Sequence, residues 1–386
     1  MATIQTFIDR SRNVQTVPEE QAKNSMTKVP VKPTYRLIAN SQDITDIIKD
    51  RLSSIRYTDA TGFESDILEI SLTDHKNDEP ITLPPTGAEL QLFLGYGDVA
   101  DLKGVFVVDE LNMGGGAGKS GYMTILARAT PYDLSKGGKS TLQSQKRRIW
   151  RRGIRLGDMV AKIAREHGME YALSQSLKTV QLPTIDQSNE SDINLLLRLA
   201  RKYDAMVKPS GGKLIFAKRG EMKTLGGEQL PTVILKPEEV ESWEVHLARR
   251  ETSGMVVASW HVPKTATKHQ IKIGSGEPVT RIRTVFQTRE MAYAAARAEY
   301  DKRKRAGTKL TLSLAGRADM LAEAPLSLSG WRQDVPTDWI ITGVTHSVGS
   351  DGWNMDVEAE LSDRRENAEW LGTFLKDQIE KRSERM

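Results

Sequence analysis

The sequence predicts a mainly β protein with an α/β insertion, and three observations support this fold class. Apolar and polar residues alternate from about residue 35 to residue 129, which is the pattern of half-buried strands. The alternation returns after residue 242, and between the two regions apolar residues recur at helical spacing. At 386 residues, with 38% hydrophobic but only 6% aromatic residues, the chain suits two or three domains with small cores.

The first β region contains four recognisable strand segments. Apolar residues alternate with polar ones over 68–72 and 90–94, and the sequence PPTG at 84–87 separates these two segments. Residues 105–111 and 122–129 complete the region and are joined by a glycine-rich hairpin loop. Short antiparallel strands of this kind predict a small barrel or sandwich.

The middle region opens with an amphipathic helix. Residues 155–169 (RLGDMVAKIAREHGM) place Val160, Ile163 and Ala164 on one apolar face. Gly168 is a suitable residue for ending the helix, because glycine accepts the left-handed conformation that follows many helices.

A second helix and a hairpin are predicted over residues 187–219. The stretch 187–205 (QSNESDINLLLRLARKYDA) begins with Ser188 or Asn189 as the expected N-cap. A turn at 209–212 and an alternating strand at 213–218 then follow. The apolar stripe of this helix consists of Ile193, Leu196, Leu197, Ala200 and Tyr203.

After residue 242 the pattern is again mostly that of strands. The Ala-rich segment 289–306 is the exception and predicts a helix, because its basic last turn and Gly307 suit a helix C-terminus. The sequence GSDG at 349–352 predicts a tight hairpin. Strands are expected at 242–246, 254–262, 279–287, 309–314, 326–330, 339–348 and 353–361.

Both ends of the chain lie outside these regions. Residues 1–28 are polar, show no sustained period and predict a flexible N-terminal arm. Residues 364–386 predict a C-terminal amphipathic helix, which either covers its own domain or docks on a neighbouring subunit. The apolar side chains of this candidate subunit or partner interface are Trp370, Leu371, Phe374 and Leu375.

Composition and charge exclude several classes of protein. The 55 basic and 51 acidic residues leave a formal charge of +4, so the whole chain has no strong attraction for nucleic acid. Without cysteine it has neither disulfides nor thiolate–metal sites, which fits assembly in a reducing cytoplasm. No apolar run approaches the roughly 18 residues of a membrane span. The first residues also lack the apolar core of a signal peptide, so we expect a soluble chain that is not exported on its own.

No motif predicts a catalytic, cofactor-binding or metal site. The run GGGAGKS at 114–120 is similar to a phosphate-binding loop, but Met113 stands where that loop needs glycine. A strand rather than a helix is expected next, so a mobile hairpin tip is the better interpretation. The six histidines show no paired ligand spacing, and His167 lacks the second histidine of a helical zinc site. We therefore predict that the chain is not an enzyme and binds no cofactor.

The basic run at 146–152 (KRRIWRR) has two interpretations. Its cations and Trp150 are the residue types that bind nucleic-acid backbones and bases. The alternative is a solvated connector with one tryptophan anchored in the domain, and we favour this second interpretation. The basic cluster at 302–305 is more simply explained as a helix end.

Five separated segments are similar in amino-acid sequence to one known family. They are ESDILEISLTD (64–74), GYGDVADLKGVFVVDEL (95–111), the helix at 155–169, the helix and KPSGG turn at 187–212, and AEAPLSLSGWR (322–332). In this order they resemble the late control protein D family (gpD) of contractile-tailed phages. The resemblance covers roughly residues 33–363 and is specific, because five segments agree rather than one short motif.

The resemblance implies an architecture and a function. The D family is similar to the hub proteins of T-even baseplates and to the hub part of VgrG-type spikes. It implies two tube-like antiparallel β-barrel domains, 29–130 and 243–363, flanking a helix-containing inserted α/β domain at 131–242. It also implies a structural baseplate hub, a trimeric ring that adapts the sixfold tail tube to the trimeric central spike. DNA would pass through its channel without specific binding.

The expected partners follow from this resemblance. They are further copies of the chain, the central spike protein, the tail tube or tube-initiator protein, and the tape-measure protein. The expected location is the tail baseplate of a virion or a tail-like particle, without membrane insertion. Two alternatives stay open: a cell-wall glycan-binding module built on the helix at 155–169, and a cell-wall hydrolase. The hydrolase would need a pair of carboxylates that the sequence does not locate.

Overall fold

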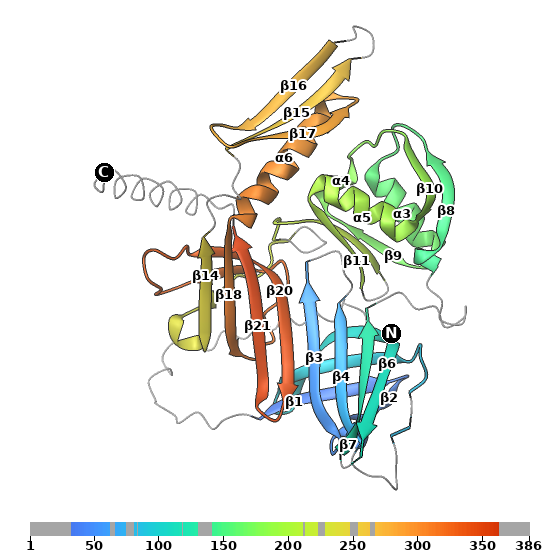
Figure 1. Ribbon diagram of the computed structural model, residues 1–386, viewed down its shortest axis with the longest axis vertical. Helices are drawn as coiled ribbons and strands as arrows, with labels where there is room; N and C mark the ends of the chain where they lie inside the picture. Colours follow the sequence, from blue (N-terminus) through green and yellow to red (C-terminus); the bar gives the residue numbers. More distant parts are fainter. Residues whose placement is uncertain are drawn as a thin grey trace. The chain divides into compact units, whose positions relative to one another are not determined.

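The computed structural model describes residues 32–61, 66–74, 81–82, 84–117, 119–129, 141–210, 213–222, 228–247, 254–262 and 267–362. The described chain is mainly β, with one large sheet of thirteen strands, three small sheets and a few helices. The predicted fold class, mainly β with an α/β insertion, is confirmed (Figure 1). The N-terminal arm expected at 1–28 lies outside the described residues, as do Trp370, Leu371, Phe374 and Leu375.

The first part of the large sheet, here called the first β-unit, comes from residues 33–128. Its elements are β1 (Pro33–Ala39), β2 (Gln42–Asp43), α2 (Thr45–Ile48), β3 (Leu52–Ala60), β4 (Ile67–Asp74), β5 (Glu89–Tyr96), β6 (Val99–Gly116) and β7 (Lys119–Arg128). The strands pair antiparallel in the order β3-β4-β7-β6-β5-β1-β2. Leu68, Ile70 and Leu92 point into one apolar core, so the predicted alternation is confirmed.

The second part, the second β-unit, has its own core around Trp339, Leu312 and Val357. Its strands are β13 (Val233–Leu235), β14 (Ser242–Leu247), β18 (Thr308–Ala315), β19 (Pro325–Leu328), β20 (Asp338–Gly349) and β21 (Gly352–Leu361). Strands β14, β18, β21 and β20 pair antiparallel, and β19 joins β13 to β20. The predicted hairpin at 349–352 is confirmed, and Gly352 has a φ of 99° that favours glycine.

The two β-units are joined directly by strands β3 and β20, which lie side by side in Figure 1. Seven residue pairs, from Gly343↔Ala60 to Gly349↔Ser54, hold this antiparallel join. On its inner side the indole N–H of Trp353 donates to Nδ1 of His346 at 3.2 Å, and the ring of Tyr57 stacks on His346. Two separate cores therefore share one continuous sheet.

Between the β-units the chain forms an inserted module with its own core. Its elements are β8 (Gln145–Trp150), α3 (Leu156–Glu166), β9 (Glu170–Leu173), α4 (Gln175–Lys178), β10 (Ile185–Ser191), α5 (Asp192–Tyr203), β11 (Ala205–Ser210) and β12 (Lys213–Lys218). Strands β8 and β10 form a ribbon, and β11, β12 and β9 form a second small sheet. Helices α3 and α5 bury Leu156, Ile163 and Leu196 in this core, so both predicted helices are confirmed.

The start of the second helix differs from the prediction. Residues 187–191 belong to strand β10, and the N-cap is Ser191, whose hydroxyl accepts from the N–H of Asn194 at 3.3 Å. Ser188 and Asn189 therefore do not cap the helix. Pairing of β10 with β8 explains the difference, because this tertiary contact outweighs local helix preference. Pro209, predicted in a turn, lies in β11.

A side module interrupts the second β-unit. It contains β15 (Met255–Val262), β16 (Thr267–Gly274), β17 (Val279–Phe286) and α6 (Arg289–Ala306). The strands form a separate sheet in the order β16-β15-β17, and α6 lies along it in Figure 1. Ala292 and Ala296 of the helix pack with Val256, Ala258 and Phe286 of the sheet. No strand at 267–274 was expected, because β16 is largely polar and exposed.

Candidate functional site

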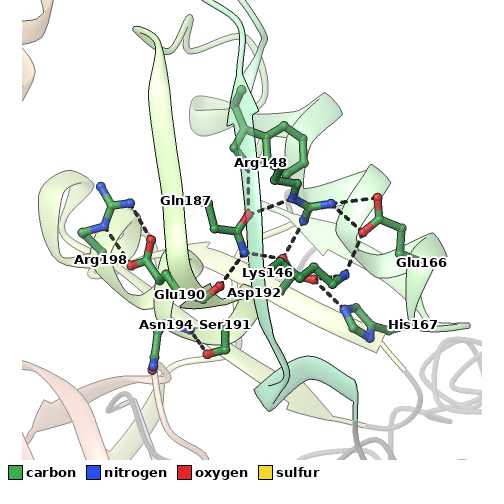
Figure 2. A network of polar contacts seen from close by, with 11 residues as sticks. Lys146, Arg148, Glu166, His167, Gln187, Glu190, Ser191, Asp192, Asn194 and Arg198 are labelled. Atoms are coloured by element: carbon green, nitrogen blue, oxygen red, sulfur yellow. Dashed lines mark hydrogen bonds and ion pairs between the residues drawn. The ribbon is translucent and has the colours of Figure 1, made fainter.

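A polar network lies at the centre of the inserted module, where Figure 2 shows side chains from β8, β10, α3 and α5 converging. The carboxylate of Asp192 is completely buried. It accepts from Lys146 Nζ at 2.6 Å, Arg148 Nη2 at 2.5 Å and Gln187 Nε2 at 2.8 Å. Nε2 of His167 lies 2.8 Å from the same carboxylate. Asp192 was not identified from the sequence as part of a site.

The electrostatics of this network favour ionised carboxylates. Burial raises the pKa of Asp192, but the hydrogen bonds from His167 and Lys146 outweigh this effect and hold the pKa well below its usual range. Glu166 accepts from both Arg148 and Lys146, which likewise outweigh its burial and lower its pKa. Two carboxylates are thus matched by two strong cations, and removing one partner would leave uncompensated charge inside the module.

The structure shows which residues of the basic run are held by the network and which are exposed. Residues 145–150 form strand β8, so the predicted solvated connector is wrong for this part. Trp150 is 4% exposed, so its predicted anchoring is confirmed. Its indole N–H donates to Gln187, and the guanidinium of Arg148 lies 4.2 Å from its ring centre. Lys146 and Arg148 are held by acidic groups of the module, whereas Arg147, Arg151 and Arg152 are exposed to solvent.

Buried ion pairs connect the inserted module to the first β-unit. Lys208 of β11 donates to Asp59 at 3.0 Å and to Asp66 at 2.8 Å. Burial raises the pKa of Asp66 to about 6, although Lys208 opposes this effect. Burial also raises the pKa of Asp59, but the attraction of Lys208 together with hydrogen bonds from Lys208 and the backbone N–H of Ala322 outweighs this effect, and the pKa is lowered.

Similar contacts connect the inserted module to the side module and to the second β-unit. The guanidinium of Arg305, in α6, binds Asp204 at the end of α5. Burial raises the pKa of Glu323 to about 7, and its carboxylate accepts from the N–H of Gly220 at 2.9 Å. These contacts join segments far apart in sequence and mark a structural junction.

One surface hollow of the described chain brings acidic and basic side chains together. A hollow of about 420 Å³ between α5 and α6 is lined by Phe286 and Met291 and contains the carboxylates of Asp204 and Glu299. Both carboxylates are bound to arginines. Within the described ranges, no group of three or more His, Asp or Glu side chains is arranged to hold a metal ion. No helix there is long and apolar enough to span a membrane.

The glycine-rich run at 114–120 lies in the hairpin of β6 and β7. Its second strand begins at Lys119, so a strand follows the glycines, as predicted. A phosphate-binding loop needs a helix at this point, and the position therefore offers no helix N-terminus to a phosphate. Met113 is 59% exposed and Tyr122 is 55% exposed beside this tip.

Within the described part of the chain the large sheet ends in two edges, which are the best candidates for a functional surface. Strand β14 ends the strand order on one side and β2 ends it on the other. At the β14 edge Trp243 is 41% exposed and packs edge-on against Trp331, with ring centres 5.2 Å apart. Unpaired strand edges bind further strands readily, and exposed tryptophan is common at interfaces. One sequence feature could have indicated this site: Trp243, which lies in the strand expected directly after the inserted domain.

Comparisons with known proteins identify the family. The family model of the phage tail baseplate hub (GPD) matches residues 107–352. The chain is 31% identical to the probable baseplate hub protein of Escherichia phage 186, over 87% of this chain and 95% of that protein.

Solved structures share the fold at low sequence identity. The 43 kDa tail protein of prophage MuSo2 from Shewanella oneidensis has a TM-score of 0.64 and 12% identity, covering 85% of this chain and 98% of that one. A chain of the Francisella PdpA–VgrG complex has a TM-score of 0.50 and 8% identity, covering 92% of this chain and 60% of that one. The predicted resemblance to the D family is confirmed, and the chain belongs to the phage tail baseplate hub family.

Proposed function

We propose that three copies of this baseplate hub protein form a ring that adapts a sixfold tail tube to a trimeric central spike. Each chain supplies two β-units, which we take to be tube-like barrels, so a trimer presents six. One observation carries the proposal: the two β-units of a single chain are already joined edge to edge through β3 and β20. The same antiparallel joining, repeated between chains, produces a closed ring.

The open edges support this assembly. In the ring, the β14 edge of one copy pairs with the first β-unit of the next copy. Such a contact is heterologous and closes after three subunits. It covers a strand edge that would otherwise be open to aggregation, and it buries Trp243.

The solvent side of the continuous sheet suits a DNA channel. Strands β20, β3, β4 and β7 place their core residues on one side and mainly hydroxyl side chains on the other. Arg56 stands opposite Glu69 in this sheet, and Asp356 and Glu358 are exposed on the adjacent β21. A neutral to acidic lining lets DNA pass without being retained. The hydroxyl residues are Ser54, Thr58, Ser71, Thr73, Thr124, Thr345 and Ser347.

The protein would act through assembly rather than catalysis. Its partners in this role are the central spike protein, the tail tube or tube-initiator protein and the tape-measure protein. It would be assembled in the host cytoplasm and remain in the baseplate of the virion or tail-like particle. We further propose that Trp370, Leu371, Phe374 and Leu375 add a second contact between subunits or to a partner.

Solution mass and electron microscopy test the ring. Light scattering is expected to give about 129 kDa, three times the 43.0 kDa chain, and class averages should show a central hole. If the ring needs the spike, adding the spike protein should produce it. A chain that stays monomeric with the spike and tube proteins present would refute the trimeric ring.

A substitution at the β14 edge tests the interface itself. Trp243→Ala is expected to weaken trimer formation by about 2 kcal/mol, roughly 30-fold in the dissociation constant, as for a typical aromatic anchor. The matched control is Tyr293→Ala, because Tyr293 is 50% exposed on α6 and away from the edge. Sedimentation measured over a concentration series should separate the two variants, and equal dissociation constants would place the interface elsewhere.

A further inference from the structure

The sheet of the side module has one side covered by helix α6 and another side, here called the open side, on which the two outer strands expose their side chains. Helix α6 packs on the side that carries Val256, Ala258 and Ile282. Side chains alternate along a strand, so the odd-numbered residues of β15 and β17 and the even-numbered residues of β16 point to the other side. The register confirms this assignment at Val257, which stands between Lys272 on β16 and Arg281 on β17. Beyond this point β17 has two extra residues, and the odd-numbered Val285 again stands opposite the odd-numbered Ser259, so Arg283 is assigned to this side from the residues that flank it.

Four cations lie on this open side. Lys268 and Lys272 come from β16, and Arg281 and Arg283 come from β17. All four are exposed. Residues four apart on a strand are separated by about 13 Å, and the outer strands of a three-stranded sheet by about 10 Å, so the charges lie close together.

The cations have no acidic counterpart on the sheet. Strands β15, β16 and β17 contain no aspartate or glutamate at all. Within the described part of the chain, none of the four cations makes an ion pair. Glu277, in the turn before β17, accepts from the backbone N–H of Val279 instead. Four like charges gathered without compensation are costly unless an anionic partner uses them.

We propose that this basic face binds the phosphate backbone of nucleic acid without reading its sequence. The inference goes beyond the ring proposed above and does not depend on it. Lysine and arginine side chains on a flat face neutralise phosphates and release their counterions. Among the described residues of this face His261 carries the one exposed aromatic ring, and a single imidazole provides no series of platforms for stacking unpaired bases, so the backbone of a duplex is the expected ligand.

Two other anionic partners fit the face less well. Protein interfaces are depleted in lysine and centre on aromatic or large apolar side chains, whereas Val257 and Ser259 in the middle of this face are buried. A membrane-binding surface needs apolar side chains that enter the lipid, and on this face only Val285 is both large and exposed. Charge without apolar anchors is the pattern of phosphate binding.

The structure also separates this face from the basic run at 145–155. In that run Lys146 and Arg148 are paired with carboxylates inside the module. Four exposed arginines remain in that run. They carry the same total charge as the four cations of the basic face and therefore serve as its control. They are Arg147, Arg151, Arg152 and Arg155.

The test measures binding of the full chain to a fluorescently labelled 30-base-pair duplex by anisotropy, at salt concentrations from 50 to 200 mM. Four neutralised phosphates give a slope of about −3.6 in a plot of log K against log salt, a loss of about 150-fold over this range. K268Q/K272Q together, or R281Q/R283Q together, should each reduce the slope by about 1.8. The quadruple variant should abolish this salt-dependent binding.

The control variant R147Q/R151Q/R152Q/R155Q removes the same charge from the other basic region. It should bind the duplex like the unmodified chain, and all variants should keep the same circular dichroism spectrum. An unchanged slope in the quadruple variant, or an equal loss in the control, would overturn the proposal. So would stronger retention on anionic lipid vesicles or on poly-glutamate than on the duplex at equal charge. None of these measurements requires ring formation, so failure here leaves the proposed hub assembly untouched.

Discussion

The buried carboxylate of Asp192 offers a sharp test of how the inserted module is held together. Asp192→Ala removes an anion that is 0% exposed and leaves Lys146, Arg148 and His167 facing one another. Breaking a buried ion pair by removing one partner costs about 3–5 kcal/mol. We expect the low end, about 3 kcal/mol, because Glu166 still binds both strong cations and their side chains are 21–29% exposed.

Hydrogen exchange is the appropriate assay, because a chain with several cores does not unfold in one step. The opening free energy of amides in β8, β10 and α5 should fall by this amount, while amides of the first β-unit should keep theirs. Glu190→Ala is the matched control. Glu190 pairs at 2.7 Å with Arg198, whose side chain is 50% exposed, so its loss should cost no more than about 1 kcal/mol. An Asp192→Ala effect as small as the control would refute the reasoning.

Three further predictions concern the joins between the parts. Burial, reinforced by Lys103, lowers the pKa of His346 from its ordinary 6.5 to about 4. The stability that the neutral imidazole contributes to the fold is therefore fully present above pH 6.5 and is lost as the pH falls toward 4. Between pH 6.5 and pH 4, the opening free energy of amides at the β3–β20 join, measured by hydrogen exchange, should fall by about 3 kcal/mol more in the unmodified chain than in the His346→Asn variant. An equal change with pH in the two proteins would contradict this. Lys208→Met should lower the opening free energy of amides in β3, β4 and β11 by about 3–5 kcal/mol in hydrogen exchange, and adding Asp59→Asn and Asp66→Asn should restore most of it; a lack of rescue would count against the buried triad. Deletion of 364–386 should lower the yield of assembled particles if that segment docks on a neighbour, with deletion of 1–28 as the control, and an unchanged yield would reject this role.

The elements that could be predicted from the sequence are those with a strong local signal. Helix α3 and the strands of the first β-unit follow from the spacing of apolar residues, since a helix or strand must turn one face to a core. Helix α6 follows from its alanine content and its basic last turn. The start of α5 was wrong because residues 187–191 pair with a strand about forty residues earlier. Strand β16 was missed because only Ile271 and Ile273 of its eight residues pack against a core.

The candidate site was only partly predictable. The absence of a phosphate-binding loop followed from Met113 and from the strand expected after the glycines, both local features. The position of β14 at an edge of the sheet could not be predicted from the sequence, because whether a strand is central or at an edge depends on which distant strand lies beside it.

The sequence by itself determined the family, through five segments spread over the chain, and the alternation of β and helical regions. Only the tertiary structure decided what each charged residue does. Lys146 and Arg148 stand in the most basic run of the sequence yet are neutralised by Glu166 and by Asp192, forty-six residues from Lys146. Lys272 and Arg281 carry no obvious motif, yet the sheet brings them together without a counterion. The physical reason is that electrostatic energy depends on distance and burial in space, and neither is encoded in the spacing along the chain.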